Sequence, residues 1–509
     1  MPKNKLKAFF VSLIFASTTF AAEPLQVWIM PNGASPQEKL EAVLADFHKK
    51  TGLETKVVVL DWGEAWGRIS AALDGGKDLP AVLQLGTTWV PYFASKGTLL
   101  NLNPYKQQFD PARFVQVSWN TTHVIGDSTT FSIPWFVDAR ALVANHRILS
   151  ENGISAVEIA TYDGFRNALK KIDAAKMALN DGTPIKAYAF PGKSDWNIPH
   201  NFAPWIWSAG GDFVSVSPDG KIARSTLLDS NTIKGIANYL SFILSGIVDR
   251  ESLSQNTAQI TQRFNNGELG FVLNTAEIVM QTRLPPEEGG LSVARIGRDG
   301  TGIYPVPQGD AGSVGFVGGS NLAIPAKFKN QKAALQLLEF LTSDEAQDAY
   351  TSHIGFLPPS QKLLDKWAQD TAYTILVAAL RTGRAYPAIP EWGDIENVLV
   401  STFSEIWAAV EFESSGTTEK IYGILVEGNN KLNGLFGIAP NAEMLTLEQF
   451  TSIWESALAK AEGKPAEPTK EEVAASGEGG SSAAVPFTIG LFVIVVIAGF
   501  AFAYKRKKN

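Results

Sequence analysis

The chain has 509 residues, of which 45% are hydrophobic and 19% are charged, and its formal net charge at pH 7 is -7. This length and balance fit two large globular domains, and an acidic chain without a basic stripe argues against nucleic acid as a partner. The absence of cysteine excludes disulfides, thiolate metal sites, a cysteine nucleophile and a lipid-bearing cysteine.

The N-terminus has the pattern of a secretory signal. Lys3, Lys5 and Lys7 precede the apolar run Ala8–Ala16, and small residues continue to Ala22. We therefore expect residues 1–22 to be a signal peptide and the rest of the chain to be exported. The alternative is an uncleaved membrane helix, against which the shortness of the apolar run argues.

Strands and helices alternate after the signal. Strands are expected at 25–30, 55–60 and 81–85. The first helix should begin at Pro36, because Ser35 and Glu38 have capping-box spacing, and it should end at Gly52. A second helix should include Ile69. This βαβαβ order predicts a parallel sheet, and ligands of such sheets gather beyond the carboxyl ends of the strands.

Tryptophans and polar side chains follow three expected strands, those at 55–60, 81–85 and 130–133. The residues at these strand ends are Trp62 and Trp66, then Thr88 and Trp89, then Trp135, Asp138 and Arg140. Flat aromatic rings can cover the C–H faces of a sugar, while carboxylates and hydroxyls pair with its hydroxyl groups. The combination is typical of a carbohydrate-binding site.

The second half of the chain is mostly helical. Helices are expected at 162–176, 232–244, 259–265, around 281, and at 392–409, 418–433 and 447–461. Two glycine-containing turns, 210–211 and 218–220, predict a hairpin in this region. A glycine-rich segment, 315–319, leads into a strand at 321–324. An amphipathic helix carrying Ala334, Leu337, Leu338 and Leu341 comes next, and a capping box at Thr342 should start the following helix.

Several motifs resemble, in the same order, those of the extracellular solute-binding proteins of ABC importers, the family that includes the maltose-binding protein. They are the segments Leu79–Leu85, Ile133–Asn145, Phe202–Asp212, Gly315–Ser360 and Ala388–Trp392. Two features depart from the family pattern. Asn274–Glu277 stands where many sugar binders carry a stacking aromatic residue, and a C-terminal membrane helix is unusual.

The resemblance implies an α/β, two-lobed periplasmic-binding-protein-like fold with a hinge. Lobe I is expected to comprise residues 23–137 and 316–357, and lobe II residues 138–315 and 358–461. The three crossings between the lobes would lie near 134–138, 313–318 and 355–359, where a few backbone positions could absorb a hinge motion.

The C-terminus predicts a membrane anchor. Residues 485–504 form an uncharged run of 20 residues, long enough to cross a bilayer as a helix, and four basic residues follow. Residues 462–484 have the composition of a flexible tether, and residues 505–509 would form a cytoplasmic tail. The alternative is a sorting tail that a protease removes.

The resemblance and the strand ends together predict a ligand-binding set. It comprises Trp62, Trp66, Thr88, Trp89, Trp135, Asp138, Arg140, Trp196, His200, Gly318 and Trp392. We expect no catalytic residue, metal or cofactor, and a function in carrying a carbohydrate, specifically an oligosaccharide, to an ABC permease. Two alternatives stay open: an exported glycoside hydrolase using Glu64 and Asp138, and the ligand-sensing subunit of a receptor.

Overall fold

The computed structural model describes residues 23–462 except 34, 106, 193–194, 222, 249, 284, 286–299, 413–416 and 441–443. These residues belong to one compact unit. None of the helices in this described part combines the length and apolar character that crossing a bilayer requires. The predicted signal peptide, 1–22, the membrane helix, 485–504, and nearly all of the tether and tail around it lie outside the described residues.

A five-stranded sheet forms the first lobe, in the strand order β2-β1-β3-β11-β4. The strands are β1 (Leu25–Ile29), β2 (Thr55–Val59), β3 (Val82–Gly86), β4 (Ser132–Ala139) and β11 (Val317–Ala323). Strand β1 pairs in parallel with β2 and β3, as the βαβαβ order predicts, whereas β11 runs antiparallel to β3 and β4.

Helices cover both faces of this sheet, so its strands are buried on both sides. The helices of this lobe are α1 (Pro36–Thr51), α2 (Trp62–Gly75), α3 (Val90–Ser95), α4 (Gln116–Trp119), α11 (Gln331–Leu341) and α12 (Asp344–Ile354). The apolar stripe of α1, including Leu40 and Phe47, packs with Leu337 and Leu338 of α11 on one face. On the other face α2 packs through Ile69 and Leu73 with α3.

The second lobe is built on a four-stranded sheet, in the order β10-β5-β9-β6. Its strands are β5 (Ala141–Asn145), β6 (Lys186–Tyr188), β9 (Leu269–Asn274) and β10 (Thr301–Tyr304), and the expected hairpin is present as β7 (Val214–Val216) and β8 (Ala223–Ser225). A large aromatic core that includes Phe165, Trp205 and Trp407 fills the space between this sheet and its helices.

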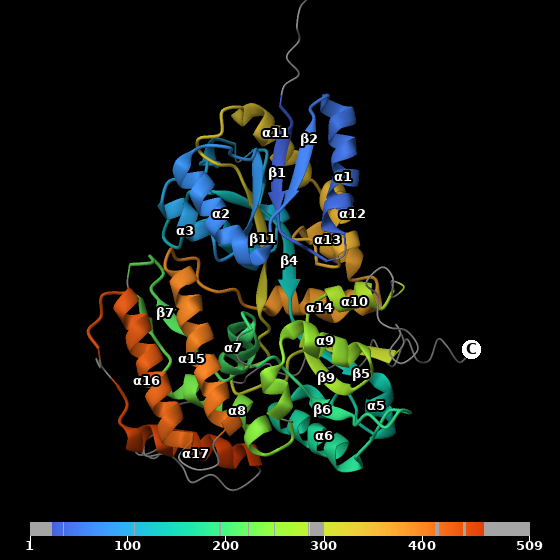
Figure 1. Cartoon of the computed structure of the whole chain (residues 1–509), viewed down its shortest axis with the longest axis vertical. Coiled ribbons are helices and arrows are strands. Elements are labelled where there is room, and N and C mark those ends of the chain that lie inside the picture. Colours follow the sequence, from blue (N-terminus) through green and yellow to red (C-terminus); the bar gives the residue numbers. More distant parts are fainter. Residues whose placement is uncertain are drawn as a thin grey trace, which may run out of the picture. The chain divides into compact units, whose positions relative to one another are not determined.

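The helices of the second lobe account for most of its mass (Figure 1). They are α5 (His146–Glu151), α6 (Tyr162–Ala175), α7 (Ile198–Ser208), α8 (Ser230–Leu244), α9 (Thr257–Asn265), α10 (Glu277–Gln281), α14 (Thr371–Thr382), α15 (Trp392–Phe412), α16 (Thr417–Leu435) and α17 (Leu447–Glu462). Helix α13 (Gln361–Trp367) instead lies beside α12 of the first lobe, where Lys366 and Trp367 donate hydrogen bonds to Asp348 (Figure 1). The helices expected from periodicity are therefore confirmed, with ends that shift by a few residues.

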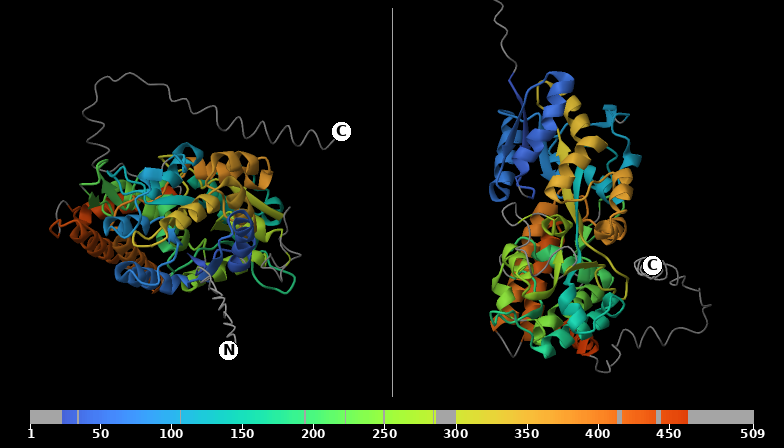
Figure 2. Two further views of the ribbon diagram at one scale, coloured as in Figure 1. Left: turned by 90° about the horizontal axis from the view of Figure 1, so that it is seen from above. Right: turned by 90° about the vertical axis from the view of Figure 1, so that its right-hand side faces the viewer.

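Two long strands connect the lobes, as the side view in Figure 2 shows. Strand β4 passes through Arg140 directly into β5, and β11 returns beside it with Gly318 opposite Asp138. A third segment lies against them, because Val137 and Leu357 exchange backbone hydrogen bonds of 2.8 and 3.1 Å. Gly319 has φ 126°, and a side chain there would meet the Phe136 carbonyl oxygen at 2.4 Å, so this position requires glycine.

Three local expectations are wrong. Ser35 adopts a left-handed conformation with φ 50° and makes no capping hydrogen bond, so the capping box does not form. Helix α12 is capped by Ser343 and not by Thr342, which bonds back to Leu338 in the preceding turn. Strand β4 continues through 134–139, where the sequence predicts a loop, so Trp135 lies within a strand.

Ser343, which caps α12, and Ser35, which makes no capping hydrogen bond, give a matched pair for testing these helix starts. Ser343→Ala removes the hydrogen bond from the Ala346 amide to the serine hydroxyl (3.3 Å) and should lower the free energy of unfolding by about 1 kcal/mol. Ser35→Ala loses no such bond, and its effect should stay within about 0.5 kcal/mol. Denaturant unfolding measures both values; equal losses would contradict the assignment.

Candidate functional site

Three tryptophans from two strand ends come together on the first lobe. Asp61 caps α2 by accepting a hydrogen bond from the Gly63 amide, so Trp62 and Trp66 follow one turn apart on the same helix face. Trp89 precedes α3, and its ring lies 5.7 Å from that of Trp62 and 5.3 Å from that of Trp66. Trp62 remains 39% exposed. We call Trp62, Trp66 and Trp89 the tryptophan cluster.

The end of β4 places Asp138 and Arg140 where the chain crosses between the lobes. Arg140 Nη2 lies 3.8 Å from Asp138 Oδ2 and donates a 2.5 Å hydrogen bond to Asn197, while the guanidinium covers the Phe316 ring. Burial raises the pKa of Asp138, and the nearby Arg140 charge only partly opposes this effect. Within the described part of the chain, Asp138 Oδ1 and Arg140 Nε are buried without a hydrogen-bond partner.

His200, on α7, extends this polar group. Its Nδ1 lies 2.7 Å from the Tyr386 hydroxyl, its Nε2 lies 3.6 Å from Glu396 Oε1, and its ring stacks on Phe316 at 4.4 Å. Burial, reinforced by the Arg140 charge, holds the pKa of His200 well below its usual value. The imidazole is therefore neutral at pH 7 and offers one N–H donor and one acceptor nitrogen.

Two further carboxyl groups, Glu277 and Glu396, belong to the site and were not predicted. Burial raises the pKa of Glu396 on α15 to about 7, and burial together with the negative charge of Asp138 raises the pKa of Glu277 on α10 to about 7. Glu277 adjoins the third crossing, since a Cβ at Gly355 would lie 3.0 Å from its Cα. We call Asp138, Arg140, His200, Glu277, Tyr386 and Glu396 the hinge site.

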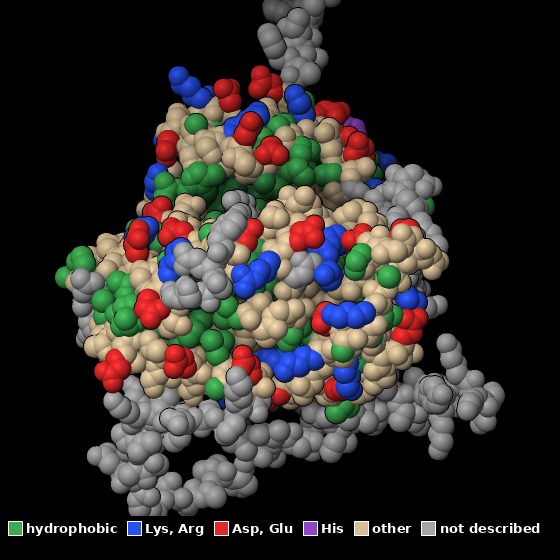
Figure 3. Space-filling model, turned by 60° about the horizontal axis from the view of Figure 1, so that its bottom comes forward, with side chains coloured by type: hydrophobic (Ala, Val, Ile, Leu, Met, Phe, Trp, Pro, Cys, Tyr) green, Lys and Arg blue, Asp and Glu red, His purple; other side chains and the backbone are tan. Residues whose placement is uncertain are grey.

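The tryptophan cluster and the hinge site meet at the start of α15. A Cβ at Gly393 would lie 3.6 Å from the Trp66 ring, and Glu396 follows Gly393 by three residues, on the same side of the helix. Figure 3 shows hydrophobic side chains in the hollow at the lower edge of the first lobe. Aromatic surface and carboxyl groups therefore lie at the boundary between the lobes.

The other predicted site residues have different surroundings. Trp135 is 1% exposed and stacks on Tyr350 at 4.6 Å, and Trp392 is fully buried and stacks on Tyr386 at 4.3 Å. The expectation that these two rings face a cleft is wrong for this structure, because they complete hydrophobic cores. Trp196 is 64% exposed and its ring meets His200 edge-on at 5.3 Å. Thr88 is half-buried beside Trp89.

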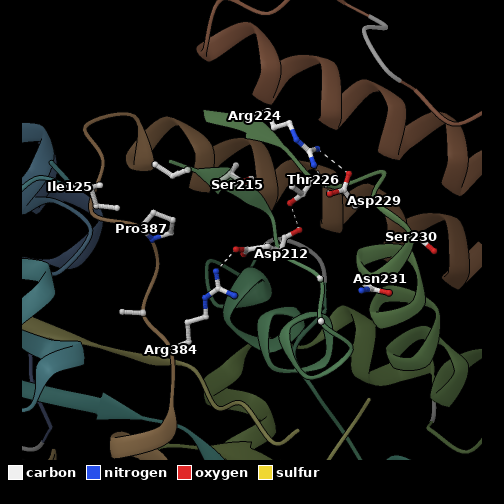
Figure 4. Close-up of a pocket in the computed structure, with 15 residues that line it drawn as sticks. Ile125, Asp212, Ser215, Arg224, Thr226, Asp229, Ser230, Asn231, Arg384 and Pro387 are labelled. Carbon is white, nitrogen blue, oxygen red and sulfur yellow. Dashed lines mark hydrogen bonds and ion pairs between the residues drawn. The ribbon is translucent and has the colours of Figure 1, made fainter. Parts of the chain in front are cut away.

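A separate cavity of about 630 Å³ lies between the β7–β8 hairpin, the start of α8 and the segment 384–387 (Figure 4). Ile125 of the first lobe also lines it. Its charges are paired: Arg384 contacts Asp212, and Arg224 bonds both oxygens of Asp229 at 3.0 and 2.9 Å. This cavity therefore offers hydroxyl and amide groups, but these four charges already have partners.

The raised pKa of Glu396 predicts a pH-dependent stability. A carboxyl group whose pKa rises on folding from 4.5 to about 7 binds its proton more tightly in the folded state, so stability falls as pH rises through that window. Glu396→Gln removes the titrating carboxyl group and therefore the loss of stability at high pH. Relative to the unmodified chain, the variant should gain about 1–3 kcal/mol in free energy of unfolding between pH 5 and pH 8.

Denaturant unfolding at several pH values measures this gain. Glu405→Gln, an exposed position on the same helix, is the control and should show no pH-dependent gain. Parallel pH profiles for Glu396→Gln and the unmodified chain would contradict the burial argument.

Comparison with known proteins places this geometry in context. Residues 42–375 match the family model described as bacterial extracellular solute-binding protein. The diacetylchitobiose binding protein DasA of Streptomyces coelicolor is 27% identical over 385 residues, which cover 74% of this chain and 83% of that protein.

Two solved structures share the fold. The sugar-binding protein MalE of Xanthomonas citri superposes with a TM-score of 0.65 at 22% identity, covering 81% of this chain and 98% of its own. The GacH receptor of Streptomyces glaucescens, solved unliganded and with acarbose, gives a TM-score of 0.64 at 19% identity over 80% and 98% of the two chains. At these identities the likeness establishes the two-lobed fold.

Proposed function

The chain belongs to the bacterial extracellular solute-binding proteins, and from this premise we propose that it binds an oligosaccharide between the tryptophan cluster and the hinge site. The observation that carries the proposal is the convergence of three tryptophan rings with Asp138, His200 and Glu396 at the boundary between two lobes. The likeness to a diacetylchitobiose binding protein supports the choice of ligand class.

The chemistry of the two halves of the site is complementary to that of a sugar. A ring of the tryptophan cluster that covers about 40–50 Å² of C–H surface contributes about 1 kcal/mol. Carboxyl groups and a neutral imidazole can accept hydrogen bonds from hydroxyl groups, and buried groups that lack partners, such as Asp138 Oδ1, gain most from them. Several such contacts together reach micromolar affinity.

The three crossings would let the lobes close over the ligand. Each crossing is a short segment, and closure needs changes at only a few backbone dihedrals. The closed form would then present the sugar to a membrane permease of the ABC type. The chain would accordingly act in binding and delivery, and hydrolysis of the bound sugar would contradict this function.

Calorimetry with a panel of diacetylchitobiose, cellobiose and maltose tests the proposal. Trp62→Ala should weaken binding of the tightest sugar about tenfold, equivalent to about 1.4 kcal/mol, because it removes the most exposed ring of the cluster. Thermal unfolding should be nearly unchanged. Asn231→Ala, in the 630 Å³ cavity, is the matched control and should bind as the unmodified chain does. The reverse pattern would relocate the ligand to that cavity.

We further propose that residues 485–504 anchor the exported protein to the membrane. Two arginines at Val495 and Ile497 should abolish this anchoring, since each costs about 2.5–3.5 kcal/mol at the centre of a membrane helix. Fractionation after an alkaline wash should find the unmodified full chain in the membrane pellet and the double variant in the supernatant. If the unmodified chain is found in the supernatant, this result would contradict the proposal that residues 485–504 anchor the protein.

A further inference from the structure

The hinge site contains more carboxyl groups than cationic groups. It contains the carboxyl groups of Asp138, Glu277 and Glu396 and a single guanidinium, that of Arg140, which lies 3.8 Å from Asp138. Within the described part of the chain, neither Glu277 nor Glu396 forms an ion pair with lysine or arginine; His200, which is neutral, is the imidazole beside Glu396. Two carboxyl groups therefore lack a cationic partner.

These carboxyl groups come from three elements that pack together at the lobe crossings. Asp138 ends β4, Glu277 begins α10 beside Gly355, and Glu396 lies in the first turns of α15 on the side that meets Trp66. A continuous line of contacts runs from Glu396 through His200 to Phe316, which Arg140 covers, and on to Asp138. This line of contacts joins the carboxyl groups of Asp138 and Glu396 near the start of α15, where Gly393 lies against Trp66 of the tryptophan cluster.

Among the described residues, no three His, Asp or Glu side chains lie close enough together to hold one metal ion. Asp138 Oδ1 and Arg140 Nε are buried and have no hydrogen-bond partner among the residues that the structure describes. Separated carboxyl groups suit cationic groups that are spaced along a larger ligand.

We propose that the ligand is an amino-sugar oligosaccharide with at least one free, positively charged amine. This inference rests on the proposed function and specifies its ligand class. An ammonium group beside Glu277 or Glu396 would stabilise the ionised carboxylate that burial disfavours, and charge-assisted hydrogen bonds are stronger than neutral ones. The tryptophan cluster would cover the C–H face of a neighbouring ring.

Three disaccharides with the same β-1,4-linked skeleton allow the contribution of the amine to binding to be measured apart from that of the rest of the sugar. Chitobiose carries two free amines, diacetylchitobiose two neutral amides, and cellobiose two hydroxyl groups at the same positions. Calorimetry at pH 7, where a sugar amine is partly protonated and a neighbouring carboxylate favours its charged form, should give chitobiose an affinity about tenfold or more above the other two. Added salt should reduce this advantage.

The possible outcomes distinguish a failure of the amine proposal from a failure of the proposed oligosaccharide binding. Diacetylchitobiose or cellobiose binding at least as tightly as chitobiose would overturn the amine proposal and leave the oligosaccharide function standing. No heat and no thermal stabilisation with any of the three, or with maltose, would contradict the oligosaccharide function itself.

Variants that remove one negative charge test which carboxyl groups bind the ammonium group of the ligand. Glu277→Gln and Glu396→Gln should each lower the ratio of chitobiose to cellobiose affinity about fivefold, and this ratio cancels any general loss of binding. Glu405→Gln, exposed on α15, is the matched control and should keep the ratio. An unchanged ratio in both test variants would overturn the assignment of the amine to these carboxyl groups.

Discussion

The antiparallel pairing of β4 with β11 fixes the geometry on which the rest of the molecule depends. Both strands belong to the sheet of the first lobe, and β4 continues through Arg140 into the sheet of the second. The register puts Gly318 opposite Asp138, while Gly319 adopts a conformation that only glycine tolerates well. The polar groups at the end of β4 are thereby held at the crossing between the lobes.

Burial at this crossing explains the electrostatics of the site. Water is largely excluded from Asp138, Glu277 and Glu396, so their ionised forms are disfavoured and their pKa values rise. Such groups weaken the fold at neutral pH and strengthen the binding of a ligand that supplies hydrogen bonds or positive charge. Perturbed carboxyl groups at functional sites commonly have this origin.

The sequence predicted the first-lobe half of the site better than the second. Trp62, Trp66 and Trp89 follow strands of a parallel sheet, whose carboxyl ends meet at one edge, and their convergence follows from that rule. Trp135 was misplaced because Pro134 favours the end of a strand, whereas β4 continues through it with a register shift opposite Ser320 and Asn321. Long-range packing, which periodicity does not encode, brings Glu277 near Asp138 and Glu396 to His200. The positions of the ligand-binding residues remain predictions.

A crystal structure of the chain with its tightest-binding sugar tests the central claim most directly. The account predicts sugar density against the rings of Trp62 and Trp89, with polar atoms within hydrogen-bond distance of Asp138 and Glu396. Density in the cavity between Arg224 and Arg384, with the tryptophan cluster untouched, would contradict it.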